Sequence, residues 1–261
     1  MSEQRLSGVR VLVTRPRERA EELCFLLEDE GAEVVALPLL ELLPPQDPRP
    51  LLAAAESIHR YEWVVFASPQ AVDSLLDAVR QAGTLHHLRR ALIACVGPRT
   101  AARARAGGLD VNIEGEAGGH ELAHDLAPRI APDSEVLIPA AEQGREEIFR
   151  VLSVVRARVT RVVAYRAEEA RPSPEAVAAL LAEPPRVGLF ASPRTVQAYL
   201  DALDETARGR LGALKYVAIG RTTAAALEEA GLKVAAVATT PSAEGLVEAA
   251  ITALRPLPGA P

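Results

Sequence analysis

Four short segments contain residues typical of helix starts, together with side chains that carry a hydroxyl group or a positive charge. Such segments suit the binding of an anionic ligand. Ser68-Pro69 and Ser192-Pro193 each place a serine before a proline, the order preferred where a helix begins. Gly97-Pro98-Arg99-Thr100 and Gly220-Arg221-Thr222-Thr223 each place a glycine at an expected turn, followed by hydroxyl groups. Because the first turn of a helix offers free N–H groups and the positive end of the helix dipole, these segments favour binding of carboxylates or phosphates.

Arginine side chains accompany these segments and extend the interpretation. Thr14-Arg15-Pro16 is expected to open the first helix in a similar way. The arginines at or beside the expected helix starts are Arg15, Arg99, Arg194 and Arg221. A guanidinium group binds a carboxylate bidentately, so the set would hold a multiply charged ligand. For any single residue the alternative is plain helix capping, and the duplicated set facing one cleft favours binding.

Tyr165 is the candidate for acid–base chemistry. It is expected to end the second strand of the second half of the chain, beside a linker. Tyrosine is common in strands, so a purely structural role stays open. Ligands of parallel sheets bind beyond the carboxyl ends of the strands, where its hydroxyl would act as a hydrogen-bond donor or a weak acid.

His120-Glu121-Leu122-Ala123-His124 matches the pattern in which two histidines on one helical face bind zinc. Its counterpart in the second half, residues 244–248, has no ligand character, and no third ligand is apparent. We therefore expect no metal site, and a surface helix that packs through Leu122 and Leu126. The remaining histidines are expected to be solvated at loop or helix ends, namely His59, His86 and His87.

The sequence has no glycine-rich phosphate loop. The turn after the first expected strand reads Thr14-Arg15-Pro16-Arg17-Glu18 instead of GxGxxG, and no GxxxxGK[ST] occurs. The sequence shows no recognisable Ser-His-Asp or Cys-His arrangement for nucleophilic catalysis. We therefore expect an activity that does not depend on a nucleotide.

An internal duplication organises the chain. Four matches recur in the same order at offsets of 123 to 125 residues, so the sequence contains two copies of one unit. The first members of these matches are Val11–Thr14, Val65–Pro69, Cys95–Thr100 and Gly108-Leu109. The second members are Val136–Pro139, Leu189–Pro193, Ala218–Thr223 and Gly231-Leu232.

Within each copy, short apolar runs alternate with helical patterns. The runs in the first copy are Val9–Val13, Val34–Leu37, Trp63–Ala67 and Leu92–Val96. The helix between the first two has apolar Leu23, Leu26 and Leu27 and should stop at Gly31. Such alternation predicts an α/β fold with doubly wound parallel sheets, in two flavodoxin-like domains of about five strands each.

Two proline-rich stretches, Leu43–Pro50 and Glu168–Pro174, follow the second expected strand of each copy. Paired linkers at equivalent places suggest that the first βαβ piece of each copy is exchanged between domains. We expect domain one to comprise residues 1–40 and 170–261, and domain two residues 48–164. Linkers at about 41–47 and 165–169 would join them.

Composition limits the classes of protein that fit. The 261 residues are 49% hydrophobic and 25% charged, which is ordinary for a globular protein. A net charge of −6 and 3% aromatic residues argue against nucleic-acid binding. Without a long apolar run or a secretory start, and with Cys24 and Cys95 interpreted as reduced core thiols, we expect a cytoplasmic monomer.

Seven short motifs occur along nearly the whole length of the chain in a characteristic order and spacing. These are Val11–Pro16, Phe66–Val72, Val96–Ala101, Glu142–Glu147, Phe190–Val196, Ala218–Thr223 and Glu244–Leu246. In these motifs the chain resembles the uroporphyrinogen-III synthase family. The resemblance implies two flavodoxin-like domains joined by a two-stranded linker. It also implies a cyclising lyase that converts linear hydroxymethylbilane to uroporphyrinogen III, with inversion of ring D and no cofactor.

The resemblance also implies roles for particular residues. A tyrosine matching Tyr165 would assist departure of the substrate hydroxyl, and positions matching Ser68, Thr100, Ser192, Thr222 and Thr223 would line the cleft for a polycarboxylate substrate. Two positions depart from the family pattern, because Ala140 stands where many members have arginine and Gln70 where Asn or Arg often follows Ser-Pro. We count Gln70 among the substrate-binding residues.

Two other classes of function stay open on the sequence alone. One is a non-catalytic relative that senses a tetrapyrrole or another ligand with the same fold. The other is a zinc hydrolase that uses His120 and His124. Tyr165 and the two threonine-rich helix starts favour the synthase over both.

Overall fold

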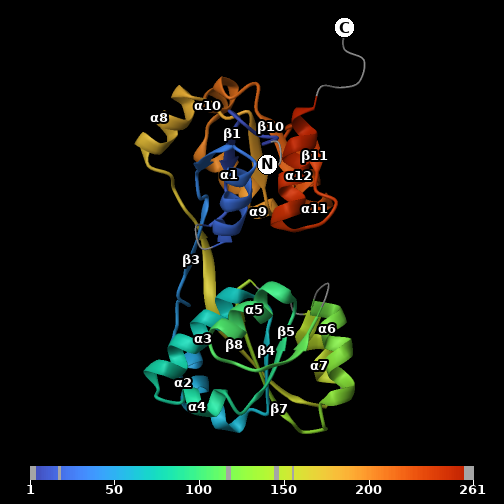
Figure 1. The fold of residues 1–261 in the computed structure, drawn as a ribbon. Helices are drawn as coiled ribbons and strands as arrows, with labels where there is room; N and C mark the ends of the chain where they lie inside the picture. The colour runs from blue at the N-terminus through green and yellow to red at the C-terminus, as the bar shows by residue number, and fades with distance from the viewer. Residues whose placement is uncertain (1–3, 17–18, 116–118, 144–146, 155, 256–261) are drawn as a thin grey trace. The chain divides into compact units, whose positions relative to one another are not determined.

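The computed structural model describes residues 4–16, 19–115, 119–143, 147–154 and 156–255. The chain divides into two units, which Figure 1 shows as a ribbon. Unit 1 comprises residues 1–41 and 168–261, and unit 2 comprises residues 42–167. Each unit is described by itself below.

Unit 1 is a parallel five-stranded sheet with helices on both faces. Its strands are β1 (Arg10–Val13), β2 (Glu33–Ala36), β9 (Val187–Phe190), β10 (Lys215–Ala218) and β11 (Val234–Val237). They lie in the order β11-β10-β9-β1-β2, and every adjacent pair is parallel. Numbered as they occur in the unit, this is the order 2-1-3-4-5 of flavodoxin-like folds.

The two faces of the unit 1 sheet are covered by different helices. The helices of the unit are α1 (Glu21–Asp29), α8 (Pro174–Ala182), α9 (Pro193–Ala202), α10 (Glu205–Arg210), α11 (Arg221–Glu229) and α12 (Ala243–Leu254). One core joins α1 and α12 to Val11 and Val13, and the other joins α8, α9 and α11 to Leu12. Successive β1 side chains therefore point to opposite, equally buried faces, which explains the uninterrupted apolar run of this strand.

Unit 2 contains a six-stranded sheet in the order β3-β8-β7-β4-β5-β6. The strands are β3 (Leu40–Leu43), β4 (Trp63–Phe66), β5 (Leu92–Cys95), β6 (Val111–Glu114), β7 (Glu135–Ala141) and β8 (Arg158–Glu169). The pairs from β8 through β6 are parallel. The boundary between the units crosses β3 and β8, and Ala170 donates a backbone hydrogen bond to Leu39 (3.0 Å) where the chain enters β3 and leaves β8.

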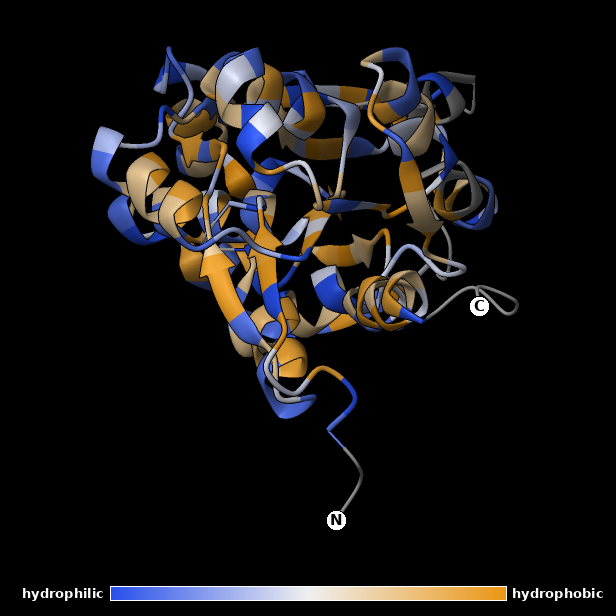
Figure 2. Ribbon diagram, turned by 90° about the horizontal axis from the view of Figure 1, so that it is seen from above, coloured by the Kyte–Doolittle hydropathy of each residue, from blue (hydrophilic) through white to orange (hydrophobic). Residues whose placement is uncertain are grey.

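The unit 2 sheet is also buried on both faces. The helical segments are α2 (Arg49–Glu56), η2 (Ile58–Arg60), α3 (Pro69–Gln81), α4 (Leu85–Leu88), α5 (Pro98–Ala106), α6 (Gly119–Leu126), η3 (Ala127–Arg129) and α7 (Glu147–Val154). One core contains residues of α2, α3 and α5, and the other contains residues of α6 and α7. Figure 2 shows the strands mainly in the hydrophobic colour, as two buried faces require. In the described residues no helix has the length and apolar character of a membrane span.

Each sheet draws strands from both halves of the sequence. β1 pairs with β9 in unit 1, and β7 pairs with β4 in unit 2. The chain therefore contributes β1-α1-β2 to unit 1, builds unit 2, and returns to complete unit 1. Strands that match in the duplication thus lie in different sheets.

Most local predictions agree with the structure. The four expected strands of the first copy match β1, β2, β4 and β5 to within one residue at either end, and α1 ends just before Gly31, whose φ is +82°. The packing of α6 through Leu122 and Leu126 is confirmed, since both are fully buried.

The prediction that Thr14-Arg15-Pro16 opens the first helix was wrong. α1 begins at Glu21 with Ala20 as its N-cap. Thr14 is fully buried, and its Oγ1 donates to the carbonyl oxygen of Leu189 at 2.7 Å. This hydroxyl therefore ties the end of β1 to the neighbouring β9, a partner that is distant in sequence.

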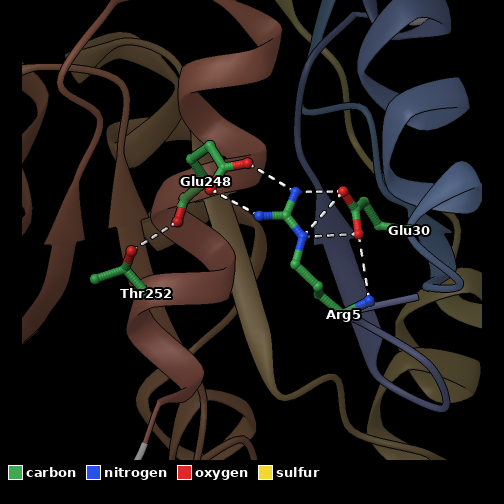
Figure 3. A network of polar contacts seen from close by, with 4 residues as sticks. All are labelled: Arg5, Glu30, Glu248 and Thr252. Carbon is green, nitrogen blue, oxygen red and sulfur yellow. Dashed lines mark hydrogen bonds and ion pairs between the residues drawn. The ribbon is translucent and has the colours of Figure 1, made fainter. Parts of the chain in front are cut away.

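A cluster of charged side chains links the N-terminal segment to the end of α1 and to α12 in unit 1 (Figure 3). Arg5 donates to both carboxylate oxygens of Glu30, just after α1, and its Nη2 lies 2.7 Å from Glu248 Oε1 of α12. Thr252 donates to the backbone oxygen of Glu248 at 2.8 Å. The hydrogen bonds from Arg5 lower the pKa of Glu30 below its ordinary value of 4.5.

We predict that Arg5→Gln lowers the urea midpoint of unfolding at pH 7, and that the difference from the unaltered chain shrinks in acid. A carboxyl whose pKa is lowered by folding stabilises the folded state above its ordinary pKa, and this stabilisation is lost as the pH falls below 4.5. Arg171→Gln is the control, because Arg171 is exposed and forms no ion pair within the described residues. A difference that stays constant down to pH 3 would contradict the assignment.

We predict opposite outcomes for two Gly→Ala changes in helices of unit 1. A Cβ at Gly245 would lie 2.0 Å from the backbone oxygen of Thr240, whereas a Cβ at Gly209 would meet nothing within 4 Å. Gly245→Ala should destabilise the chain by about 2 kcal/mol through overpacking. Gly209→Ala should stabilise it by about 0.5 kcal/mol, since alanine favours a helix. Urea unfolding of both variants provides the measurement.

Candidate functional site

The predicted site residues lie at the carboxyl edge of the sheet in each unit. In unit 2, Ser68 follows β4 and Gly97 follows β5. In unit 1, Arg15 follows β1, Ser192 follows β9 and Gly220 follows β10. Because the strands are parallel and adjacent, each sheet gathers its own set of helix starts along one edge.

Ser68 and Ser192 are N-caps, as predicted. Ser68 Oγ accepts a hydrogen bond from the N–H of Ala71 in α3, and Ser192 Oγ accepts one from Thr195 in α9, each at 3.2 Å. Their backbone angles are nearly equal, with φ and ψ of −160° and 154° at Ser68 and of −164° and 157° at Ser192. The duplication is thus preserved in local geometry.

Gly97 and Gly220 begin α5 and α11 without a side-chain cap. Both have extended backbones that any residue can adopt, so conformation does not require glycine there. A Cβ at Gly220 would also meet nothing within 4 Å. First-turn N–H groups that no side chain covers can be satisfied by a ligand, and the absence of a Cβ lets that ligand approach closely.

The threonines differ in exposure. Thr222 is exposed, whereas Thr100 and Thr223, the third residues of α5 and α11, are 5% and 1% exposed. Arg99 and Arg221 are exposed at the starts of the same two helices, and Arg15 and Arg194 are half-buried. Arginine and backbone donors therefore account for most of the positive character at these edges.

A hollow of about 640 Å³ opens at the start of α11 in unit 1. Its wall includes Gly220 and Arg221 at the start of α11, Val237 at the end of β11, and Thr239 and Pro241 after that strand. These last three residues were not predicted as site residues. Their position in the sequence could have predicted them, because they lie at or just after the carboxyl end of a parallel strand, as the predicted residues do.

Tyr165 lies within β8 and not at its end, contrary to the prediction. β8 continues to Glu169 because β3 lies beside it and extends the sheet. The ring is 6% exposed and belongs to the core beneath α3. Its Oη is 3.1 Å from Ser68 Oγ, and Gln70, the second residue of α3, is half-buried.

Cysteine chemistry is disfavoured at the carboxyl edge of the unit 2 sheet. Cys95 ends β5 and is fully buried. Burial raises the pKa of its thiol to about 12, so the reactive thiolate is scarce near neutral pH. Cys24 is also a free thiol, but it is half-buried and therefore not the core thiol that was predicted, because it lies on the partly exposed flank of α1.

The HExxH segment, where no metal site was expected, forms part of α6, and the other histidines lie on η2 and α4. His124 of α6 is exposed, and the side chain of His120 falls outside the described residues. His59 and His86 are exposed and His87 is half-buried, on η2 and α4, which precede β4 and β5. They therefore lie toward the amino edge of the unit 2 sheet, opposite Ser68.

Comparison with known sequences points to one family. The sequence model of uroporphyrinogen-III synthase HemD matches residues 21–248. The chain is 27% identical over 231 residues to the porphyrin biosynthesis protein HemD of Ruminiclostridium josui, which covers 87% of this chain but only 45% of that protein. It is 29% identical over 253 residues to the chloroplastic uroporphyrinogen-III synthase of Oryza sativa subsp. japonica, covering 94% of this chain and 80% of the relative.

A solved structure supports the fold. The uroporphyrinogen-III synthetase of Helicobacter pylori 26695 aligns with a TM-score of 0.65 and 18% identity, over 92% of this chain and 97% of that one. At this identity the likeness concerns the fold. The predicted α/β class with parallel sheets is confirmed.

Proposed function

Since the chain belongs to the uroporphyrinogen-III synthase family, we propose that it cyclises hydroxymethylbilane to uroporphyrinogen III, with inversion of ring D and release of water. The match to the family over residues 21–248 carries this proposal. The chemistry of the two sheet edges supports it.

The substrate is a linear tetrapyrrole with eight carboxylates, and each unit offers donors suited to them. In unit 2 these donors are the first-turn N–H groups of the helices capped by Ser68 and Gly97, with Gln70, Arg99 and Thr100 in those turns. In unit 1 they are the first-turn N–H groups after Ser192 and Gly220, with Arg194, Arg221, Thr222 and Thr223 in those turns and Arg15 beside them. Carboxylates gain about 0.3–1 kcal/mol from each helix N-terminus, so binding strength requires several of them together. We propose that the carboxylates of the substrate bind at helix starts of this kind.

The reaction needs few acid–base groups. Departure of the hydroxyl leaves an electrophilic azafulvene, and ring D attacks it through a spiro intermediate. Holding the ends of a flexible chain in the reactive geometry supplies much of the rate, because bound reactants avoid the entropy cost of meeting. Sites that bind many carboxylates serve this purpose without a metal or a cofactor.

Tyr165 is the residue proposed to assist the hydroxyl. A phenol hydroxyl can give its proton to a leaving oxygen at hydrogen-bonding distance. Its Oη lies beside the start of α3, one of the proposed carboxylate sites. The proposal further takes the protein to act as a cytoplasmic monomer on this small molecule, without nucleic acid or membrane, in keeping with its net charge of −6.

We predict that the purified chain converts enzymatically generated hydroxymethylbilane to the type III isomer. Chromatographic separation of the oxidised products distinguishes type III from the type I isomer of spontaneous cyclisation. Production of type I alone, at the uncatalysed rate, would instead favour a non-catalytic protein that senses tetrapyrroles.

We predict that Tyr165→Phe lowers kcat by about 100-fold, the lower range for loss of a general acid, and lowers the unfolding free energy by only about 1 kcal/mol. Tyr61→Phe is the matched control, because Tyr61 also packs against the unit 2 core beneath α3. If kcat is unchanged in both Tyr165→Phe and the control, the hydroxyl of Tyr165 takes no part in the reaction and its role is structural.

A further inference from the structure

A bulge in β8 decides where Tyr165 points. Residues of β8 pair in register with β7 up to Ala140 and Val163, but the next pair is Ala141 with Tyr165, which leaves Ala164 as an extra residue. In a regular strand Ala164 and Tyr165 would face opposite sides of the sheet. Both instead belong to the core beneath α3, together with Val162. Bulges re-aim side chains in this way, often beside active sites.

The re-aimed phenol meets the hydroxyl that caps α3. Ser68 Oγ accepts from the N–H of Ala71 at 3.2 Å and lies 3.1 Å from Tyr165 Oη. A serine hydroxyl has one hydrogen and two lone pairs, and the Ala71 bond uses a lone pair. The serine hydrogen is therefore available for donation to Tyr165, although the distance alone allows either hydroxyl to be the donor. Accepting from a helix N-terminus makes the serine hydroxyl a stronger donor, which favours donation from Ser68.

The second copy of the motif shows that this arrangement is not an obligate part of the cap. Ser192 has the same cap geometry, but its Oγ contacts Thr195 Oγ1 at 2.8 Å. Ala71 occupies the position in α3 that Thr195 occupies in α9, and alanine offers no competing hydroxyl. The capping hydroxyl of unit 2 is thereby available to Tyr165.

We propose that Ser68 is a positioning residue that donates its hydroxyl hydrogen to Tyr165 Oη, so that the phenol proton is directed at the leaving hydroxyl of the substrate. This inference rests on the proposed function and on the assignment of Tyr165 within it. Ser68 acts through Tyr165 and not by direct contact with the reacting atoms.

The proton balance of the step is complete. As the C–O bond breaks, its electron pair leaves with oxygen, which takes the proton of Tyr165 and departs as water. The resulting phenolate keeps the hydrogen bond from Ser68, which is stronger to a charged acceptor. Ring closure later releases a proton from the attacked pyrrole carbon, and this proton restores the phenol.

The test is a double-mutant cycle on kcat for formation of the type III isomer, in the full chain. Ser68→Ala should lower kcat about tenfold with little change in KM, because it removes a hydrogen bond to a charged group. The same change in a Tyr165→Phe background should alter kcat less than about twofold, since no phenolate forms there. Ser68→Thr, which keeps the hydroxyl and the cap, should restore most of the activity.

Two further variants separate positioning from helix capping. Ser173 caps α8 with the same bond to an alanine N–H, at 3.2 Å, and so Ser173→Ala removes an equal cap outside the site and should leave kcat unchanged. Ser68→Asp keeps a good N-cap but has no hydrogen to donate. It should therefore fold normally, as judged by thermal melting, and still lose at least as much kcat as Ser68→Ala.

The outcomes distinguish this inference from the proposed function. Loss of kcat on Ser68→Ala that persists in the Tyr165→Phe background, or full activity in Ser68→Asp, would overturn the positioning role while leaving the synthase activity intact. Failure of the unaltered chain to make the type III isomer would overturn the proposed function, and the inference with it.

Discussion

The first-turn N–H groups of the helices that follow the parallel strands have no partner within their own helices, and this constraint shapes the carboxyl edge of each sheet. The side chains of Ser68 and Ser192 each accept a hydrogen bond from one of these N–H groups. Gly97 and Gly220 have no side chain to do so, which leaves the N–H groups of α5 and α11 available to a ligand or to solvent. Parallel pairing aligns these starts along one edge, so their partial positive charges add. A chain with a net charge of −6 can in this way offer carboxylate sites without a basic surface.

The duplication produces a similar carboxyl edge in each unit, and the two edges differ in the partner of the capping serine. Ser68 and Ser192 have nearly identical backbone angles and equal capping distances. One hydroxyl faces Tyr165 and the other faces Thr195. A single position in the first turn, alanine in α3 and threonine in α9, determines which partner the cap can take. In the proposed reaction the acid–base group, Tyr165, belongs to unit 2, and each unit has helix starts suited to anions.

Stability and function depend on different contacts. The strands of both units are buried on two faces, so their apolar side chains hold the sheets while the edges stay free for polar groups. Arg5 links the N-terminal segment to α1 and α12, away from the helix starts. The β8 strand serves both needs, because Val162 and Ala164 fill the unit 2 core and the bulge beside them turns Tyr165 toward Ser68.

Patterns in the sequence were enough to predict the α/β class, the strands of the first copy, the serine caps and the edge at which the candidate site residues gather. Each of these follows from local periodicity or from side-chain chemistry within one helical turn. The same patterns could not predict that Thr14 bonds to Leu189, that β8 continues past Tyr165, or that the extra residue Ala164 turns the tyrosine toward Ser68. These features depend on how strands pair in the folded protein, namely β1 with β9, β3 with β8 and β7 with β8. A shift of one residue in such pairing exchanges the two faces of a strand, and no local pattern in the sequence reports it.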